Sequence, residues 1–330
     1  MIFGPVPTRD AVGAVLAHSM QGAAGKVAKG TLLTPDHVAN LAKAGHAELT
    51  VARLEPGDTE ENAAAGQLAA ALVPDPEGQH LRLSAAGAGR VNLIATGPGV
   101  VQIDADAVAA LNAVDPMVTL ATVPPFHRVD PGTLVGTIKI IAYAVPETSV
   151  RGAVAQARGA VTVLPPRYAT ATLIETRVTQ ETPAPKGRAA LTGRLDRLGL
   201  ALTDRVVVPH RTGDIAAAIR GAPGDFVFVL TASATSDPAD VAPEGLRAAG
   251  GRVEAYGMPV DPGNLLFFGW LGTKPVIGLP GCARSPALNG ADWVLERLIC
   301  GVDLRQADIS AMGVGGLLKE IPTRPRPRAG

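Results

Sequence analysis

The sequence has few aromatic residues, only two cysteines and no excess of charge of either sign. Aromatic residues make up 3% of the 330 residues, so the hydrophobic cores must be built from alanine, valine and leucine. The 30 basic and 30 acidic side chains balance, which argues against a nucleic-acid or membrane-surface partner. Cys282 and Cys300 are too few for a disulfide framework or a zinc set.

Targeting signals and common nucleotide motifs are also missing. No apolar run reaches the roughly 18–20 residues of a membrane-spanning helix, and the N-terminal segment lacks the basic-then-apolar order of a signal peptide. We therefore expect a cytoplasmic protein. The chain contains no Walker A, Gly-x-Gly-x-x-Gly or Gly-x-Ser-x-Gly motif, and its six histidines show no metal-binding spacing.

What the chain does have is ample apolar sequence for two domains, or three small ones. Hydrophobic residues make up 47% of it. Region 1–165 mixes helical and strand-like patterns and is predicted to be a mixed α+β region. Its predicted helices are 7–19, 34–46 and 58–73, and its clearest predicted strand is 47–55.

From about residue 168 the pattern becomes regular, with strands and helices in alternation. The predicted strands are 169–178, 204–210, 225–233 and 252–258, and 265–281 reads as a hairpin. The predicted helices are 186–200, 212–222, 242–251 and 285–301. This alternation predicts a three-layer α/β/α domain with a mostly parallel sheet over 166–305. Residues 306–330 form a C-terminal segment with a Pro/Arg-rich tail at 321–330.

Three polar loops follow predicted strands of this domain: 231–241, 261–264 and 276–286. Ligands of such sheets bind beyond the carboxyl ends of the strands, so we expect the loops to converge at one edge. The candidate ligand-binding residues are Thr231, Ser233, Ser236, Asp237, Asp240, Pro262, Gly263, Asn264, Gly281, Cys282, Ala283, Arg284, Ser285 and His210.

The first loop offers hydroxyls and carboxylates. Ser233 and Ser236 are predicted to donate to a ligand, and Asp237 and Asp240 have the oxygen ligands that Mg²⁺ prefers. Asp240 is the one catalytic candidate. The alternative is an ordinary polar loop in which Asp240 caps the next helix, just as 261–264 can be a plain β-turn.

In the third loop, Arg284 and Ser285 are expected at a helix N-terminus, where free N–H groups and the helix dipole favour a phosphate. A tight turn that binds nothing is the alternative. Cys282 could be a nucleophile or a ligand, but a cysteine without a paired His or Cys is usually neither. Cys300 is expected in the core.

Together these loops resemble a known family. Residues 168–301 are similar to the molybdopterin-binding domain shared by molybdopterin adenylyltransferases and molybdopterin molybdenumtransferases. The segment ASATSDPADVAPEGL (232–246) matches the Pro-x-Asp-Val-x-Pro-Glu motif, DPGN (261–264) matches a Pro-Gly turn, and LPGCAR (279–284) matches a Leu-Pro-Gly loop. The resemblance implies that molybdopterin is the ligand or substrate, with Mg²⁺ and ATP needed if adenylate is transferred.

The finer resemblance is to a subgroup of bacterial molybdopterin-binding proteins, carried by HSMQGAAGKVAKGTLLT, GMPVDPGNLL and MGVGGLLKEI. In many of these, such a region is joined to a domain resembling the molybdenum cofactor cytidylyltransferases, and no such domain is expected here. The resemblance implies that 1–165 is a molybdenumtransferase-like accessory part. It also implies a homo-oligomer, with a separate nucleotidyltransferase or molybdoenzyme as a possible partner.

Two departures from the family pattern affect the predicted activity. Ala232, Ser233 and Thr235 replace glycines of the family's first loop, and His210-Arg211 stands where adenylyltransferases carry an Asp pair. Losing an acid from a magnesium site weakens the case for phosphoryl transfer, whereas the added positive charge suits a dianionic phosphate. We therefore expect a binder of molybdopterin or molybdenum cofactor without full catalytic competence. The alternatives are a molybdopterin adenylyl- or molybdenumtransferase, and a protein that binds or senses another phosphorylated ligand.

Overall fold

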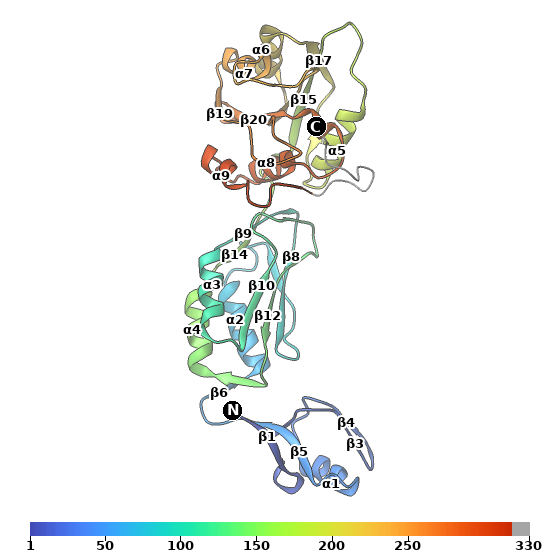
Figure 1. The fold of residues 1–330 in the computed structure, drawn as a ribbon, viewed down its shortest axis with the longest axis vertical. Coiled ribbons are helices and arrows are strands. Elements are labelled where there is room, and N and C mark those ends of the chain that lie inside the picture. The colour runs from blue at the N-terminus through green and yellow to red at the C-terminus, as the bar shows by residue number, and fades with distance from the viewer. Residues whose placement is uncertain (319–330) are drawn as a thin grey trace. The chain divides into compact units, whose positions relative to one another are not determined.

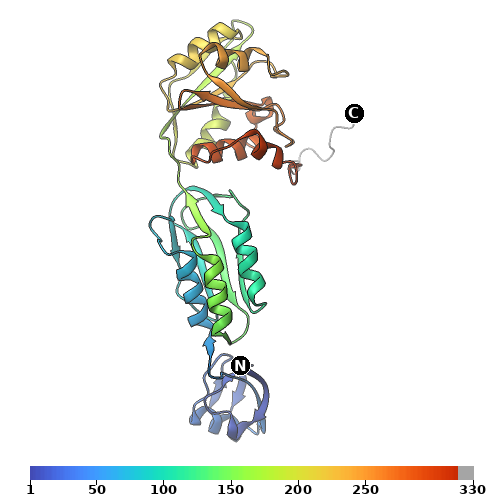
Figure 2. The same cartoon turned by 90° about the vertical axis from the view of Figure 1, so that its left-hand side faces the viewer.

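The computed structural model describes residues 1–318, so the predicted tail at 321–330 lies outside the described residues. The chain divides into two compact units (Figures 1 and 2). Unit 1 consists of Met1–Gly97 and Val101–Val163, and unit 2 contains Pro98–Val100 and the chain from Leu164 onward. Within residues 1–318, no helix has the length and apolar character needed to cross a membrane.

Unit 1 begins with a small sheet of order β1-β5-β2, a β-hairpin and a short helix. The elements are β1 (Ile2–Pro7), η1 (Thr8–Asp10), β2 (Val15–Leu16), β3 (Met20–Gly22), β4 (Gly25–Val27), α1 (Pro35–Lys43) and β5 (Glu48–Arg53). The predicted start of α1 is confirmed, because the Thr34 side chain accepts the N–H of His37 and Pro35 occupies the first turn.

The helix predicted over 7–19 is wrong. One 3-10 turn is followed by Gly13 at φ +78, a left-handed conformation that ends helical geometry. Ala11, Ala14 and Leu16 are buried in the core without a helix.

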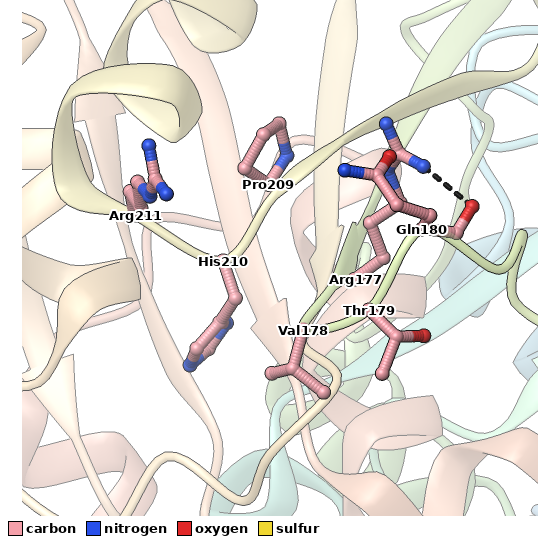
Figure 3. Close-up of a pocket in the computed structure, with 7 residues that line it drawn as sticks. All are labelled: Arg177, Val178, Thr179, Gln180, Pro209, His210 and Arg211. Atoms are coloured by element: carbon pink, nitrogen blue, oxygen red, sulfur yellow. Dashed lines mark hydrogen bonds between the residues drawn. The ribbon is translucent and has the colours of Figure 1, made fainter.

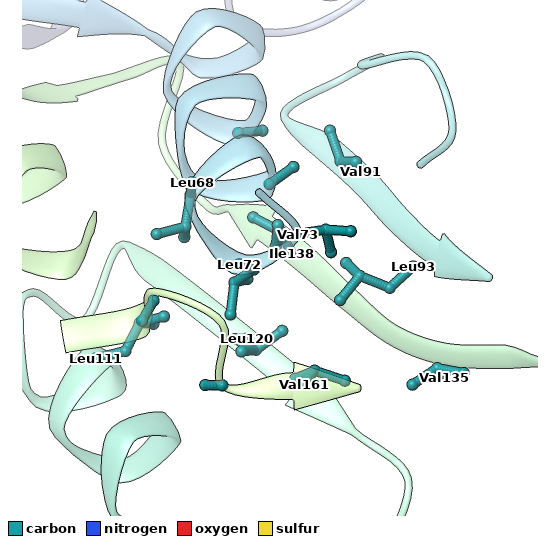
Figure 4. Close-up of a cluster of buried hydrophobic side chains, with 14 of the residues drawn as sticks. Leu68, Leu72, Val73, Val91, Leu93, Leu111, Leu120, Val135, Ile138 and Val161 are labelled. Carbon is teal, nitrogen blue, oxygen red and sulfur yellow. The ribbon is translucent and has the colours of Figure 1, made fainter. Parts of the chain in front are cut away.

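The remainder of unit 1 is an antiparallel sheet of order β10-β12-β8-β7, with smaller strand groups β11-β9-β14 and β13-β6. Its elements are β6 (Asp58–Glu60), α2 (Glu61–Leu72), β7 (Leu81–Leu83), β8 (Arg90–Ala95), β9 (Gly99–Ile103), α3 (Ala105–Val114), β10 (Val118–Thr122), β11 (Arg128–Val129), β12 (Leu134–Ile140), β13 (Ala144–Pro146), α4 (Glu147–Ala157) and β14 (Val161–Leu164). Figure 4 shows the core, a single buried cluster that contains Leu68 and Leu72 of α2 and Leu93 and Ile138 of the sheet. This cluster consists of Ala, Val, Leu and Ile, as the scarcity of aromatic residues predicted.

Unit 2 is built on a seven-stranded sheet of mixed orientation. Its elements are β15 (Thr170–Arg177), α5 (Lys186–Asp196), β16 (Ala201–Leu202), β17 (Val206–Pro209), α6 (Thr212–Gly221), β18 (Phe226–Leu230), α7 (Val241–Ala248), β19 (Arg252–Tyr256), β20 (Phe267–Leu271), β21 (Lys274–Leu279), η2 (Gly281–Arg284), α8 (Gly290–Ile299) and α9 (Gln306–Ala311). The strand order is β16-β15-β18-β21-β20-β19, and β17 also pairs with β15. Strands β15, β16, β17, β18 and β21 are parallel, whereas β20 is antiparallel to both of its neighbours.

Strand β18 lies at the centre of the unit 2 core. All five of its residues are buried, as its continuous apolar sequence predicted. Val227 and Val229 pack with Ile215 and Ile219 of α6 and with Leu246 of α7. The alternate residues Phe226 and Phe228 point to the other face, where their rings stack with centroids 4.8 Å apart.

Two predicted helix starts are corrected. Helix α8 begins at Gly290 rather than at residue 285, and residues 281–284 form the separate 3-10 helix η2. Arg284 and Ser285 therefore do not lie at the N-terminus of α8. Helix α2 begins at Glu61 rather than at residue 58, because Asp58–Glu60 form strand β6 and Glu60 is the N-cap.

Candidate functional site

The three predicted loops leave the unit 2 sheet at the same edge. Leu230 at the end of β18 is in register with Leu279 at the end of β21. Tyr256 at the end of β19 pairs with Phe267, which in turn pairs with Gly278. We call the loops after these strands the first loop (231–240), the second loop (257–266) and the third loop (280–289), and this side of the sheet the loop edge.

The first and third loops are in direct contact. The Arg284 guanidinium donates a hydrogen bond to the backbone oxygen of Thr231, with Nη2 and O 2.6 Å apart. Arginine has five N–H donors, so this one contact fixes the side chain across the first loop and leaves other donors for a ligand. Arg284 is half-buried.

The second loop meets the N-terminus of α8, directly after the third loop. The Gly290 N–H donates to the Pro262 oxygen over 2.8 Å. Gly263, at φ +145, lies so close that a Cβ there would come within 2.9 Å of Gly290 backbone atoms. Asn264 instead turns back on its own loop, because its amide nitrogen donates to the Met258 oxygen at 3.3 Å. The structure thus joins the second loop to the third through Pro262 and Gly263 rather than through Asn264.

Beneath the third loop lies a buried arginine that the sequence analysis missed. Arg194 of α5 is 3% exposed, and its Nε donates to Asp292 Oδ1 at 2.5 Å. Its two remaining nitrogens donate to four backbone oxygens, of Ala190, Ala283, Ser285 and Ala287. All five N–H donors are therefore used, and three of the bonds hold the third loop in place.

Asn289 and Asp292 complete the support of the third loop. They form a capping box at the start of α8, in which the Asn289 N–H donates to Asp292 Oδ2 at 2.8 Å. The Asn289 amide also donates to Cys282 Sγ at 3.0 Å. The sequence pattern Asn-Gly-Ala-Asp at 289–292 carries this cap signal and could have placed the start of α8 correctly.

Several backbone N–H groups of the three loops have no partner among residues 1–318. In the first loop they include those of Ser233, Ala234 and Thr235, and in the third loop those of Gly281 and Cys282. Successive free N–H groups in a loop form an anion-binding arrangement. The loop edge therefore offers two sets of donors, joined by the contact of Arg284 with Thr231.

Some of the predicted ligand-binding side chains are instead used within the loops. Thr231 is buried, and its hydroxyl donates to the backbone oxygen of Ser233 over 2.6 Å. Ser285 Oγ accepts the Ala287 N–H at 3.3 Å, and Ala283 is buried. Ser233 and Ser236 are exposed, although the Ser236 hydroxyl also reaches the Ala234 oxygen at 3.4 Å.

The two acids of the first loop serve its fold. Asp240 is the N-cap of α7, and its two oxygens accept the N–H groups of Val241 and Ser236. Asp237 accepts the Ala239 N–H at 2.7 Å. Burial, together with the negative charges of Asp237 and Asp240, raises the pKa of Tyr256, whose hydroxyl donates to the Thr235 oxygen at 3.0 Å.

These acids fit a magnesium ion poorly. Three of their four carboxylate oxygens already accept backbone N–H groups. No group of three or more His, Cys, Asp or Glu side chains in the described part of the chain could hold a metal. The capping alternative accounts for Asp240.

His210 connects a neighbouring cavity to the first loop. Its Nδ1 lies 2.9 Å from Thr176 Oγ1, and the same oxygen accepts the Ala232 N–H at 2.7 Å. The cavity, about 370 Å³, lies where β15 and β17 end and is shown in Figure 3. Its lining residues are Arg177, Val178, Thr179, Gln180, Pro209, His210 and Arg211.

The two cysteines differ in environment. Cys282 is exposed, and its sulfur contacts the Asn289 amide rather than a histidine or a second cysteine. Cys300 is buried at the end of α8, as expected for a core residue, and burial raises the pKa of its thiol to about 12. The environment of Cys300 is not that of an activated thiolate.

Comparisons with known proteins give limited information. A family model described as "Domain of unknown function (DUF8806)" matches residues 5–53, within unit 1. No curated protein matches the chain. Among solved structures, the chain is similar to the crystal structure of the molybdopterin biosynthesis MoeA protein from Pyrococcus horikosii, with 15% identity and a TM-score of 0.32, over 91% of this chain and 75% of that chain. A TM-score this low establishes no common fold.

Proposed function

We propose that the loop edge of unit 2 binds molybdopterin or molybdenum cofactor, and that the protein serves maturation of this cofactor without itself completing a transfer reaction. The motifs of the first, second and third loops occur in the order that the molybdopterin-binding family has. The region 166–305 would then be the molybdopterin-binding domain of three-layer α/β/α type, with 1–165 as its accessory part.

The observation that carries the proposal is that two loops at the same edge of the sheet have backbone N–H groups without a partner among residues 1–318. Ser233, Ala234 and Thr235 offer consecutive N–H groups, and Gly281 and Cys282 offer two more. A phosphorylated pterin has a dianionic phosphate and several polar ring atoms, so it suits a site rich in backbone donors with an arginine beside it.

Each part of the loop edge has a role in this proposal. Arg284 and the N–H groups of Gly281 and Cys282 hold the phosphate. The hydroxyls of Ser233 and Ser236, with the N–H groups of 233–235, face the pterin. Arg194 does not contact the ligand in this proposal but holds the loop that carries Arg284 in place.

We propose no catalytic step because the carboxylates that such a step would need are engaged elsewhere or missing. Both oxygens of Asp240 accept backbone N–H groups at the cap of α7, and His210-Arg211 follows β17 in place of carboxylates. Transfer of adenylate or insertion of molybdate with Mg²⁺ and ATP has less support. ATP hydrolysis that requires both molybdopterin and Mg²⁺ would contradict this part of the proposal.

The test of binding is the pterin content of protein purified from cells that make molybdopterin, measured as the fluorescence of the released, oxidised pterin. The wild-type chain is expected to carry pterin. Arg284→Gln should weaken binding by about 1–3 kcal/mol, the cost of losing a charge-assisted hydrogen bond.

Arg220→Gln is the matched control, because Arg220 is exposed on α6 and, within residues 1–318, donates only to the Ala248 backbone oxygen. It should retain the wild-type pterin content. Absence of pterin from the wild-type protein, or an equal loss in both variants, would contradict the proposal.

A further inference from the structure

The cavity between the ends of β15 and β17 is lined by two arginines and a histidine. Arg177 ends β15, and His210 and Arg211 follow β17 directly. Arg177 is in register with Pro209, and the His210 N–H donates to the Arg177 oxygen at 2.9 Å, so the two strand ends hold these side chains around one space. In Figure 3, Arg177 and Arg211 lie on either side of Pro209.

The charge of this cavity is not balanced by its own lining. None of the seven lining residues is Asp or Glu. Arg211 is exposed, and its side chain has no ion pair or hydrogen bond within residues 1–318. Arg177 uses one of its five N–H groups to donate a hydrogen bond to the backbone oxygen of Gln180, over 2.6 Å. Two arginines with donors to spare thus border a cavity of about 370 Å³, within the range of about 300–1,000 Å³ for small-molecule sites.

From this arrangement we infer that the cavity binds a phosphate group, as a second anion site beside the three loops. Two guanidinium groups match the charge of a phosphate dianion, and their planar donor pairs match its oxygens. The cavity is larger than a phosphate ion, which leaves room for the organic part of a phosphate ester. The inference rests on the cavity itself and does not need the ligand of the three loops to be a pterin.

Thr176 gives this site a physical connection to the first loop. Its Oγ1 accepts the N–H of Ala232 and lies 2.9 Å from His210 Nδ1. The Thr176 hydroxyl therefore holds the imidazole beside the cavity while it is hydrogen-bonded to the first loop.

The experiment is protection of individual arginines from phenylglyoxal in the full chain, with the modified residues identified by mass spectrometry. Inorganic phosphate is the probe, and chloride at equal ionic strength is the control. Phosphate is expected to slow modification of Arg177 and Arg211 at least fivefold and to leave the exposed Arg220 unchanged. Equal rates in phosphate and chloride would overturn the inference.

A binding measurement separates the cavity from the loops. Arg211→Gln is expected to lower the affinity for inorganic phosphate about tenfold at low salt, whereas Arg220→Gln, in the last turn of the helix that follows Arg211, should not change it. Phosphate protection that is unchanged in Arg211→Gln, or abolished by Arg284→Gln alone, would overturn the assignment to this cavity. Loss of pterin binding with phosphate protection intact would contradict the proposed function and leave this inference standing.

The same protection experiment with phenyl phosphate as the probe distinguishes free phosphate from a phosphate ester. Phenyl phosphate that protects Arg177 and Arg211 at concentrations no higher than inorganic phosphate supports an ester as the ligand. Protection by inorganic phosphate alone supports the free ion. Protection by neither would contradict the site.

Discussion

The starts and the ends of the central strands of the unit 2 sheet use polar groups differently. Where β15 and β18 begin, threonine and aspartate side chains hydrogen-bond to one another and to nearby backbone N–H groups. Thr170 Oγ1 donates to Asp225 at 2.8 Å, and Thr172 Oγ1 accepts the Gly224 N–H at 3.0 Å. At the loop edge, by contrast, consecutive N–H groups remain without partners in the described residues.

This difference follows from the direction of the strands. Parallel strands end at the same edge, so the loops that follow them gather there, and ligands of such sheets bind at that edge. The parallel strands begin at the opposite edge, where the polar groups need only hydrogen-bond to one another. The comparison therefore predicts that variants of the loop edge change binding, whereas variants of the opposite edge change stability alone.

The largest expected effect is that of Arg194→Met. It leaves the buried Asp292 carboxylate unpaired and removes the hydrogen bonds to three third-loop oxygens. Breaking a buried ion pair from one side costs about 3–5 kcal/mol in the free energy of unfolding. Denaturant unfolding followed by tryptophan fluorescence measures it, because Trp270 and Trp293 are the two tryptophans of the chain and both belong to unit 2.

The matched control for this variant is Arg197→Met, at the exposed end of the same helix. It should change the free energy of unfolding by no more than about 0.5 kcal/mol. Equal effects of the two substitutions would show that Arg194 does not hold the third loop.

A smaller effect is expected at the opposite edge from Thr172→Val. Thr172 is fully buried, and the substitution removes the acceptor of the Gly224 N–H and the partner of the Thr203 hydroxyl. The unsatisfied N–H should cost about 1–3 kcal/mol in the same unfolding measurement. Pterin content per folded protein should stay at the wild-type level, and a specific loss of pterin would break the distinction between the two edges.

The smallest effect is expected from Asp225→Asn. The Thr170 hydroxyl and neighbouring backbone N–H groups lower the pKa of Asp225. A carboxyl group whose pKa is lower in the folded state stabilises the fold at pH values above its ordinary pKa. This stabilisation is lost as the pH falls through the pKa of the folded state. Because Asp225 is exposed, the difference at pH 7 should stay below about 1 kcal/mol.

The pH dependence provides the check on Asp225→Asn. Unfolding measured at pH 7 and again near pH 3 should show the gap between wild type and variant closing at the lower pH. A gap that widens on acidification would contradict the assigned contact.

Much of the fold could be predicted because the signals for it are local. Thr34-Pro35 marks the start of α1, and the apolar run of β18 indicates a strand buried on both faces. The helix predicted over 7–19 is wrong because the apolar spacing continues across Gly13, whose left-handed backbone ends the turn. Tertiary contacts, not periodicity, bury Ala11 and Leu16 there.

The candidate site was less predictable because its support comes from distant residues. Arg194 contacts Asp292, 98 positions further along the chain, and no local pattern on α5 distinguishes it from the exposed Arg197. The loops themselves were identified from turn residues and motif order. What each side chain does within them, such as the capping by Asp240, depends on the folded geometry.

The most direct test of the account is a crystal structure of the full chain with molybdopterin bound. We expect pterin density at the loop edge, with its phosphate within hydrogen-bond distance of Arg284 and of the N–H groups of Gly281 and Cys282. Density for the pterin on another face, or a well-ordered loop edge with no pterin under conditions where binding is measured in solution, would contradict it.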